Sequence, residues 1–171
     1  MSTFTGSLKR VEHRDLPLLI TWRNHPDVRA YMYSQHQISP AEHQQWFDRQ
    51  SHDQNSHLFI YSEESQPCGF AQLRVAKERA EWGFYLAPEA KKGTGTRLGK
   101  TVLDWAFQNL NLHKVSGEAL DFNHASIRFH HKLGFVDEGR LRDHIKINET
   151  FHDVLCFGLL ESEWAIKREA L

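Results

Sequence analysis

Hydrophobic and polar positions in the first part of the chain predict a strand followed by two helices. A strand is expected near residues 8–12, and the run LLITWRN predicts a helix opened by Asp15, with Pro17 in its first turn. The run SPAEHQQWFDRQ predicts a second helix, because Ser39 can cap its first turn and Glu42, three residues later, can complete a capping box.

Three short runs in the middle of the chain predict a meander of strands. HLFIYS, CGFAQLRV and AEWGFYL are rich in β-branched and aromatic residues and are separated by polar turns. A glycine-rich segment then leads into a long amphipathic helix. Its apolar residues at helical spacing are Leu98, Val102, Leu103, Trp105 and Ala106.

The last third of the chain predicts a strand, a helix, further strands and a short final helix. After the strand KVSGEAL, Asn123 caps a helix that ends at Gly134. The following residues alternate like strands joined by turns at 137–139 and near Asn148, and ESEWAIKRE closes the chain as a helix. This order predicts an α/β fold, of the α+β kind with a mixed sheet, as a single domain over residues 1–171.

The composition supports one domain and excludes several classes of function. With 171 residues, 40% of them hydrophobic, the chain is long enough for one buried core. Its 21 Lys and Arg residues balance 22 Asp and Glu residues, so it lacks the broad positive field of nonspecific nucleic-acid binding. Its apolar runs are far shorter than the ~20 residues that span a bilayer, and residues 1–10 hold no apolar signal core. We therefore expect a cytoplasmic protein with neither a nucleic-acid nor a membrane partner.

Cysteine and histidine give no metal signature. Cys68 and Cys156 are far apart and flanked by apolar residues, so each is expected to be a buried thiol. None of the twelve histidines has the spacing of a metal site, and the adjacent His130 and His131 would diverge by about 100° on a helix. We therefore expect no metal.

Residues 91–99, KKGTGTRLG, place two closely spaced glycines at the start of a predicted helix. Such glycines let the backbone approach a phosphate, while the first amides of the helix donate hydrogen bonds at the positive end of its dipole. The cations that would add positive charge there are Lys91, Lys92, Arg97 and Lys100. The segment predicts an anion cradle, although a glycine-rich turn before a helix is often only a turn, and it lacks the ending of a Walker loop.

A second segment, NHASIRFHHKLGF at residues 123–135, predicts a capped helix that ends in Gly-Phe. Together with KKGTGT it resembles the Gcn5-related N-acetyltransferase (GNAT) superfamily, over nearly the whole chain. The resemblance implies a mostly antiparallel central sheet flanked by helices, in which the fourth strand, AEWGFYL, and the fifth, KVSGEAL, splay apart to admit a thioester. It also implies acetyl-CoA as co-substrate, with its pyrophosphate on the glycine loop and its pantetheine arm on the fourth strand.

The same resemblance assigns the residues that hold acetyl-CoA, and a backbone amide of residues 84–86 would hold the oxyanion of the tetrahedral intermediate. The cofactor-binding residues implied are Phe84, Tyr85, Leu86, Lys91, Lys92, Gly93, Thr94, Gly95, Thr96, Asn123 and Lys132. Ala90 is a departure, because the superfamily usually has Arg or Gln there. We expect Lys91 or Lys92 to supply the charge and binding to be weakened rather than abolished, since backbone amides make most of the phosphate contacts.

Three further segments narrow the resemblance. WRNHPDVRAYM, ISPAEHQQWF and the C-terminal GFVDEGRLRDH with FHDVLCFGLLESEW are similar to the aminosugar N-acetyltransferases of pseudaminic acid biosynthesis. Those enzymes acetylate the 4-amino group of UDP-4-amino-4,6-dideoxy-N-acetyl-β-L-altrosamine, so a UDP-aminosugar is the implied small-molecule partner of a monomer or homodimer. The tail alone also occurs in ribosomal-protein alanine and spermidine acetyltransferases. A non-catalytic acyl-CoA-binding module is the alternative of another class.

Acetyl transfer to an amine needs a base for the amine and an acid for the departing thiolate. The candidate bases are Glu81, Glu118 and His43, and we favour a water relay near Glu81; a solvated strand carboxylate is the alternative. The superfamily commonly has a tyrosine acid seven residues after the capping Asn123, where this chain has His130. An imidazolium can protonate a thiolate of pKa about 8.5, but His130 could equally be a packed helix histidine.

Substrate recognition is expected in the N-terminal half. The guanidinium of Arg23 suits a diphosphate, and His43 could hydrogen-bond the same group. The resemblance adds Gln72 and Arg74 of the third strand and Tyr85 of the fourth as residues facing the nucleotide sugar.

Overall fold

A seven-stranded sheet forms the centre of the computed structural model, which describes residues 6–171. The strands are β1 (Gly6–Arg10), β2 (Ser56–Glu63), β3 (Gln66–Ala76), β4 (Arg79–Leu86), β5 (Lys114–Leu120), β6 (Val136–Ile147) and β7 (Thr150–Leu160). They lie in the order β1-β2-β3-β4-β5-β7-β6, and β4 with β5 is the one parallel pair among the described strands. The predicted mixed, mostly antiparallel sheet is confirmed.

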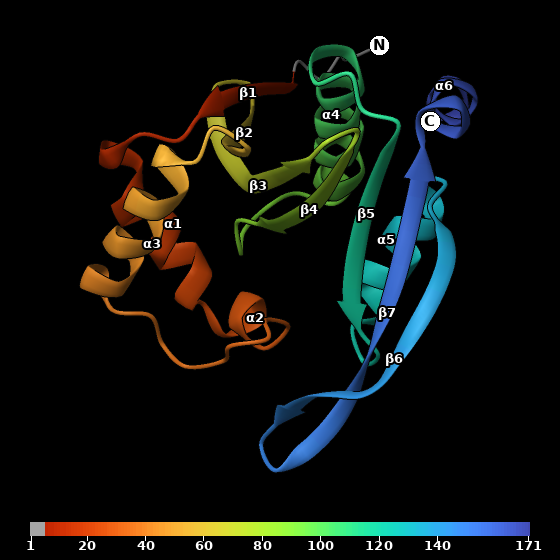
Figure 1. Ribbon diagram of the computed structural model, residues 1–171. Helices are drawn as coiled ribbons and strands as arrows, with labels where there is room; N and C mark the ends of the chain where they lie inside the picture. Colours follow the sequence, from red (N-terminus) through yellow and green to blue (C-terminus); the bar gives the residue numbers. More distant parts are fainter. Residues whose placement is uncertain (1–5) are drawn as a thin grey trace.

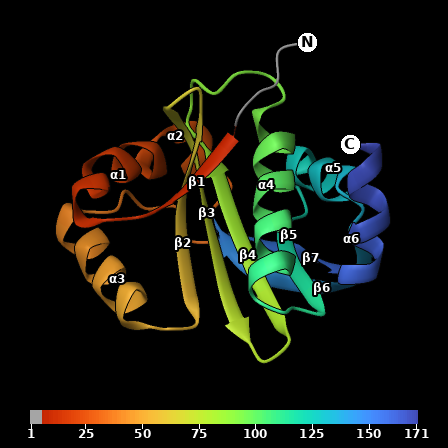
Figure 2. The same cartoon turned by 90° about the horizontal axis from the view of Figure 1, so that it is seen from above.

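Helices cover both faces of this sheet, as Figures 1 and 2 show. On one side lie α1 (Leu16–Asn24), α2 (Pro26–Arg29) and α3 (Pro40–His52). On the other lie α4 (Thr94–Asn109), α5 (His124–Lys132) and α6 (Glu161–Lys167). We call the two sides the α1 face and the α4 face.

β2 is buried on both faces and separates two of the three hydrophobic clusters of the core. Leu58 and Ile60 pack with α1 and α3, whereas Phe59 and Tyr61 belong to the larger cluster beneath α4. A strand buried on both faces has no solvated side, and the centre of β2, residues 58–61, is accordingly an uninterrupted run of hydrophobic residues.

The predicted helix starts are confirmed at α1 and α3, but two carboxylates are used differently. Ser39 accepts a hydrogen bond from the Glu42 amide at 3.2 Å, while the Glu42 carboxylate pairs with His36 at 2.8 Å and does not complete the predicted capping box. Asp15 is the N-cap residue of α1, and its carboxylate accepts from the Glu12 amide at 2.8 Å. Both carboxylates therefore fix the preceding loop rather than the helix itself.

β4 and β5 pair over only three residue pairs and then part (Figure 1). The pairs join Arg79–Glu81 to Lys114–Ser116. Beyond Glu81, β4 stays paired with β3 alone, and beyond Ser116, β5 stays paired with β7 alone. The predicted splaying is confirmed, so each strand turns an edge of backbone groups toward the other.

β6 and β7 form a long hairpin that projects from the rest of the fold (Figure 1). The turn predicted at residues 137–139 is wrong, because β6 runs through these residues with only a register shift between Asp137 and Gly139. β7 pairs with β6 on both sides of this shift, so the extra residue, Glu138, forms a bulge and its carboxylate binds Lys114 at 2.6 Å. The turn predicted near Asn148 is confirmed, with positive φ at Asn148 and Glu149.

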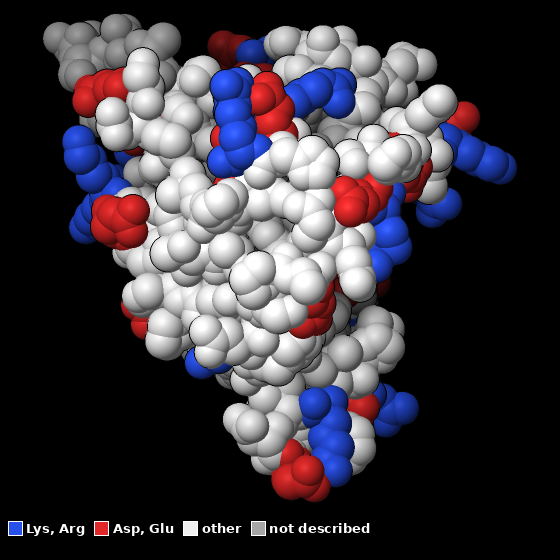
Figure 3. Space-filling view, turned by 90° about the vertical axis from the view of Figure 1, so that its left-hand side faces the viewer, with Lys and Arg blue, Asp and Glu red and all other residues white. Residues whose placement is uncertain are grey.

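The cysteines differ from expectation, since Cys68 and Cys156 are both half-buried free thiols rather than fully buried ones. On the face drawn in Figure 3, acidic and basic groups are scattered among uncharged side chains. Within residues 6–171, every helix is too short or too polar to cross a membrane.

Candidate functional site

Glu81 and Glu118, from the two parted strands, both lie on the α1 face. Side chains alternate along a strand, so Glu81 shares a face with Tyr85. The Tyr85 ring stacks on Phe70, with 4.9 Å between the ring centroids, and Phe70 belongs to the hydrophobic cluster that packs with α1 and α3. On β5, Val115 and Ala119 pack into the α4 cluster, so the intervening even-numbered positions face the other way. Glu118 is thus the first position on this face beyond the last paired residue of β5.

A tyrosine that the sequence did not single out completes this group. Tyr33, in the loop between α2 and α3, donates a hydrogen bond from its hydroxyl to Oε2 of Glu118 at 2.5 Å. Partial burial raises the pKa of Tyr33, and the charges of Glu118, Cys156 and Glu81 raise it further. The hydrogen bond to Glu118 places the phenol just beyond the point where β4 and β5 stop pairing.

The backbone of β4 presents hydrogen-bond donors to the same point. The Ala87 amide donates to the Cys68 carbonyl on β3 at 2.9 Å. Donors alternate along an antiparallel strand, so the amides of Phe84 and Leu86 point away from β3, toward the parting. These are residues for which an oxyanion or pantetheine contact was predicted.

His130 lies on the α4 face and is only 1% exposed. Its Nδ1 donates to the Ser126 carbonyl at 2.8 Å, and its Nε2 accepts a hydrogen bond from Nε1 of Trp82 at 3.1 Å. Its ring stacks on Phe157 with 4.5 Å between centroids. Burial lowers the pKa of His130 to about 4, so the ring is neutral near pH 7 and both nitrogens are engaged. This geometry favours the packed-histidine alternative over the acid.

The glycine loop leads into α4 through Gly93, the N-cap residue, whose φ is +88°. A left-handed residue of this kind suits glycine and turns the chain sharply into the helix. Thr94 donates its amide to the Lys91 carbonyl at 3.1 Å. The next two amides, of Gly95 and Thr96, are in the first turn and have no acceptor within the helix. They are the donors that an anion would meet.

Two of the four cations expected around this loop are committed elsewhere. Arg97 binds the Glu63 carboxylate at 2.6 and 3.0 Å and lowers its pKa through these hydrogen bonds. The Thr94 side chain is buried against the same pair, with Oγ1 at 3.2 Å from Arg97. Lys100 donates to the Arg168 carbonyl at 2.9 Å. Lys91 and Lys92, by contrast, are exposed beside the loop.

Asn123 and Lys132 lie at opposite ends of α5. The Asn123 side chain caps the helix by accepting a hydrogen bond from the Ser126 amide at 3.1 Å. Lys132 is exposed in the last turn. The hydrogen bond of Asn123 is thus local to α5, and Lys132 faces solvent.

The residues predicted to bind substrate fall into an interior group and an exposed group. Arg23 donates to the Ser34 carbonyl at 3.0 Å, and its Nη1 is enclosed with no hydrogen-bond partner. His43 is buried and stacks on Trp46, and burial lowers its pKa, as does the charge of Arg23. Burial raises the pKa of Tyr85, which lies near Arg23.

Gln72 and Arg74 follow each other on the α1 face of β3 but have different surroundings. Gln72 donates to Gln50 at 2.7 Å and to Ser56 at 3.3 Å, so it is tied to α3 and β2. Arg74 is exposed and lies 4.0 Å from Glu81. Of the two arginines predicted to bind substrate, Arg74 is the more exposed.

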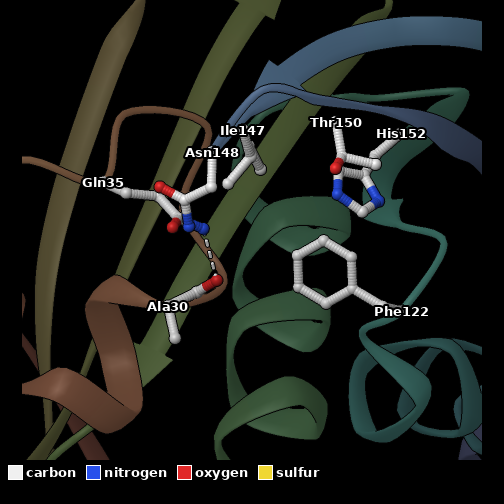
Figure 4. Close-up of a pocket in the computed structure, with 7 residues that line it drawn as sticks. All are labelled: Ala30, Gln35, Phe122, Ile147, Asn148, Thr150 and His152. Atoms are coloured by element: carbon white, nitrogen blue, oxygen red, sulfur yellow. Dashed lines mark hydrogen bonds between the residues drawn. The ribbon is translucent and has the colours of Figure 1, made fainter.

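A pocket of about 350 Å³ lies between the α2–α3 loop and the tip of the β6–β7 hairpin (Figure 4). Its lining residues are Ala30, Gln35, Phe122, Ile147, Asn148, Thr150 and His152. Figure 4 shows the side chains of Gln35 and Asn148 together on one side and the rings of Phe122 and His152 on the other. The pocket therefore combines an aromatic ring with amide and hydroxyl groups. Among the described residues, no group of three or more His, Cys, Asp and Glu side chains is arranged to hold a metal ion.

Comparison with known proteins gives consistent matches. The acetyltransferase (GNAT) domain family matches residues 7–136. The chain is 26% identical over 167 residues to the spermidine N(1)-acetyltransferase of Escherichia coli K12, covering 95% of this chain and 90% of that one. It is 24% identical over 140 residues to the acetyltransferase PseH of Campylobacter jejuni, covering 80% and 88%. The crystal structure of spermidine N-acetyltransferase from Vibrio cholerae with CoA and spermine superposes with a TM-score of 0.87 at 25% identity, covering 94% and 98%.

Proposed function

The chain belongs to the GNAT acetyltransferase family and is an N-acetyltransferase, and from this premise we propose that it transfers acetyl from acetyl-CoA to the amine of a UDP-linked 4-amino-4,6-dideoxy sugar in a ternary complex. The pocket between the α2–α3 loop and the hairpin tip carries this choice of acceptor. Its lining holds no Asp, Glu, Lys or Arg side chain. A polyamine would favour carboxylates along its whole length, whereas a sugar ring suits an aromatic face bordered by amides and a hydroxyl.

The residues around the parted strands fit acetyl-CoA. The first-turn amides of Gly95 and Thr96 would hold the pyrophosphate, with Lys91 and Lys92 supplying charge in the absence of an arginine at Ala90. The β4 edge at residues 84–86 would hold the pantetheine arm and the thioester oxygen.

Glu81 is the proposed base for the acceptor ammonium, through a water molecule. An amine on a carbon flanked by oxygenated carbons should have a pKa of roughly 8, so most of it is protonated at pH 7. The Glu81 carboxylate is exposed and lies on the face from which the acceptor would approach. Arg74, 4.0 Å away, would meet the diphosphate of the same substrate.

The test is an assay of thiol release from acetyl-CoA with three acceptors: the UDP-4-amino sugar, spermidine and a peptide with an N-terminal alanine. The sugar is expected to give the highest kcat/KM. A higher value for spermidine, the substrate named for two relatives, or for the peptide would overturn the choice of acceptor. Acetyl-CoA binding without release with any acceptor would support a non-catalytic acyl-CoA-binding module.

Asn148→Asp is expected to raise KM for the UDP-sugar roughly fivefold and to leave kcat unchanged, because the new carboxylate would repel the anionic nucleotide sugar whose ring the pocket holds. Asp tolerates the positive φ at this position. Asn111→Asp is the matched control, since Asn111 also has a positive φ and lies in the α4–β5 loop, outside the pocket. Steady-state kinetics of both variants would check the effect, and an equal KM in the two would remove the pocket from the acceptor site.

A further inference from the structure

Acetylation of an ammonium group must dispose of two protons. The first leaves when the ammonium becomes a nucleophilic amine, and the second leaves the nitrogen after it has bonded to the acetyl carbon. One proton must also reach the sulfur as the C–S bond breaks. Glu81 accounts for the first of these protons, while the neutral, enclosed His130 leaves the sulfur without an evident donor.

Tyr33 and Glu118 lie just beyond the last paired residues of β4 and β5, where the thioester would enter. Tyr33 is 44% exposed, and its hydroxyl meets Glu118 at the first α1-face position beyond the paired part of β5. The loop that carries Tyr33 is fixed to α1, because Arg23 donates to Ser34 at 3.0 Å and Asn24 exchanges two hydrogen bonds of 2.8 Å with Ile38. The α2–α3 loop therefore holds the phenol over the gap between β4 and β5, in contact with β5.

We propose that Tyr33 and Glu118 form a proton relay that carries the second proton of the acceptor amine to the sulfur of coenzyme A. This inference rests on the proposed acetyl transfer and adds two residues to it. The amine nitrogen forms a bond to the acetyl carbon, and Glu118 takes the proton from that nitrogen. As the C–S bond breaks and its electron pair goes to sulfur, Tyr33 gives its hydroxyl proton to the thiolate. The phenolate then recovers a proton from the Glu118 carboxyl group along their hydrogen bond, which restores the starting state.

The charge of Glu118 sets the order of these transfers. While Glu118 is ionised, it is among the groups that hold the pKa of Tyr33 above its usual value, so the phenol is a poor acid. Protonation of Glu118 by the amine removes that negative charge and makes Tyr33 a stronger acid at the moment when the thiolate needs a proton. The phenol therefore becomes a donor only after the amine has attacked.

The test compares Tyr33→Phe, Glu118→Gln, the double variant and Tyr31→Phe in the complete protein. Tyr31 is the matched control because it is in the same loop and is 45% exposed, against 44% for Tyr33. The assay measures thiol release with acetyl-CoA and whichever acceptor gives the wild type its highest kcat/KM. Each single variant is expected to lower kcat roughly 10²-fold with KM for both substrates within about twofold of wild type. The double variant should lose no more than either single one, and Tyr31→Phe should match the wild type.

Three results would overturn the relay while leaving acetyl transfer in place. The first is a kcat of Tyr33→Phe equal to that of the wild type. The second is a loss confined to KM of the acceptor, which would make Tyr33 a residue that positions the loop. The third is a multiplied loss of kcat in the double variant, which would contradict a shared relay. A wild type that acetylates no acceptor would instead overturn the proposed function, and the relay with it.

Discussion

Replacement of Glu81 by glutamine is expected to lower kcat for amine acetylation by roughly 10²- to 10³-fold near pH 7. Glutamine has nearly the same shape but cannot accept a proton, so the ammonium must lose its proton to bulk water. Glu81 is exposed, and its partner Arg74 is 4.0 Å away, so the substitution should change stability little. The loss should shrink as the pH rises past roughly 8, because an acceptor amine of that pKa then arrives already deprotonated.

Glu78→Gln is the control for this experiment. Glu78 is exposed in the turn that leads into β4, three residues before Glu81. Its side chain has no role in the proposed chemistry. Thiol release should be measured for both variants from pH 6.5 to 9. A Glu81→Gln enzyme with unaltered kcat, or with a deficit that stays constant across this range, would remove Glu81 as the base.

Much of the fold could be predicted because its signals are local. Ser39 and Asn123 cap helices where the sequence placed them, and Gly93 takes the left-handed conformation that a turn into a helix requires. The splaying of β4 and β5 was implied by family resemblance, and the structure confirms it with only three residue pairs between the strands. Local sequence and family pattern thus fixed the frame that holds the site.

The parts that escaped prediction depend on contacts between distant segments. Tyr33 and Glu118 are 85 residues apart, and no spacing rule connects them. Arg97 was expected to add positive charge at the glycine loop, but Glu63, 34 residues away, holds its guanidinium. The segment at 137–139 has the composition of a turn, yet the neighbouring β7 keeps it extended. In each case a tertiary partner decided between two locally acceptable states.

His130 shows the same limit at a single residue. Its place in the motif matched that of an acid, whereas its protonation state depends on Trp82, on Phe157 and on burial, none of which the motif reveals. Gly117 is part of this arrangement, because a Cβ there would lie 2.5 Å from the Trp82 nitrogen and 2.6 Å from the His130 nitrogen. The hydrogen bond between Trp82 and His130 therefore passes beneath β5 only because residue 117 has no side chain.

The buried neutral state of His130 should make the protein lose stability as the pH falls from about 6.5 to about 4. The folded pKa of about 4 lies below the usual value of 6.5, so the unfolded chain takes up a proton in this range before the folded protein does. The stabilisation is complete above pH 6.5 and disappears toward pH 4. Between pH 7.5 and pH 5 the difference in the free energy of unfolding amounts to about 2 kcal/mol.

His130→Gln tests this linkage, because glutamine offers an acceptor to Trp82 but does not titrate. We expect urea unfolding of this variant to show a free-energy difference between pH 7.5 and pH 5 that is smaller by about 2 kcal/mol than in the wild type. His131→Gln is the control, since His131 is the next residue of α5 but is exposed and pairs with Asp137 at 2.7 Å. Other titrating groups are shared by the three proteins and cancel in the comparison. An equally steep pH dependence in His130→Gln would mean that His130 takes up a proton in the folded protein as readily as in the unfolded chain, which would restore it as a candidate acid for the thiolate.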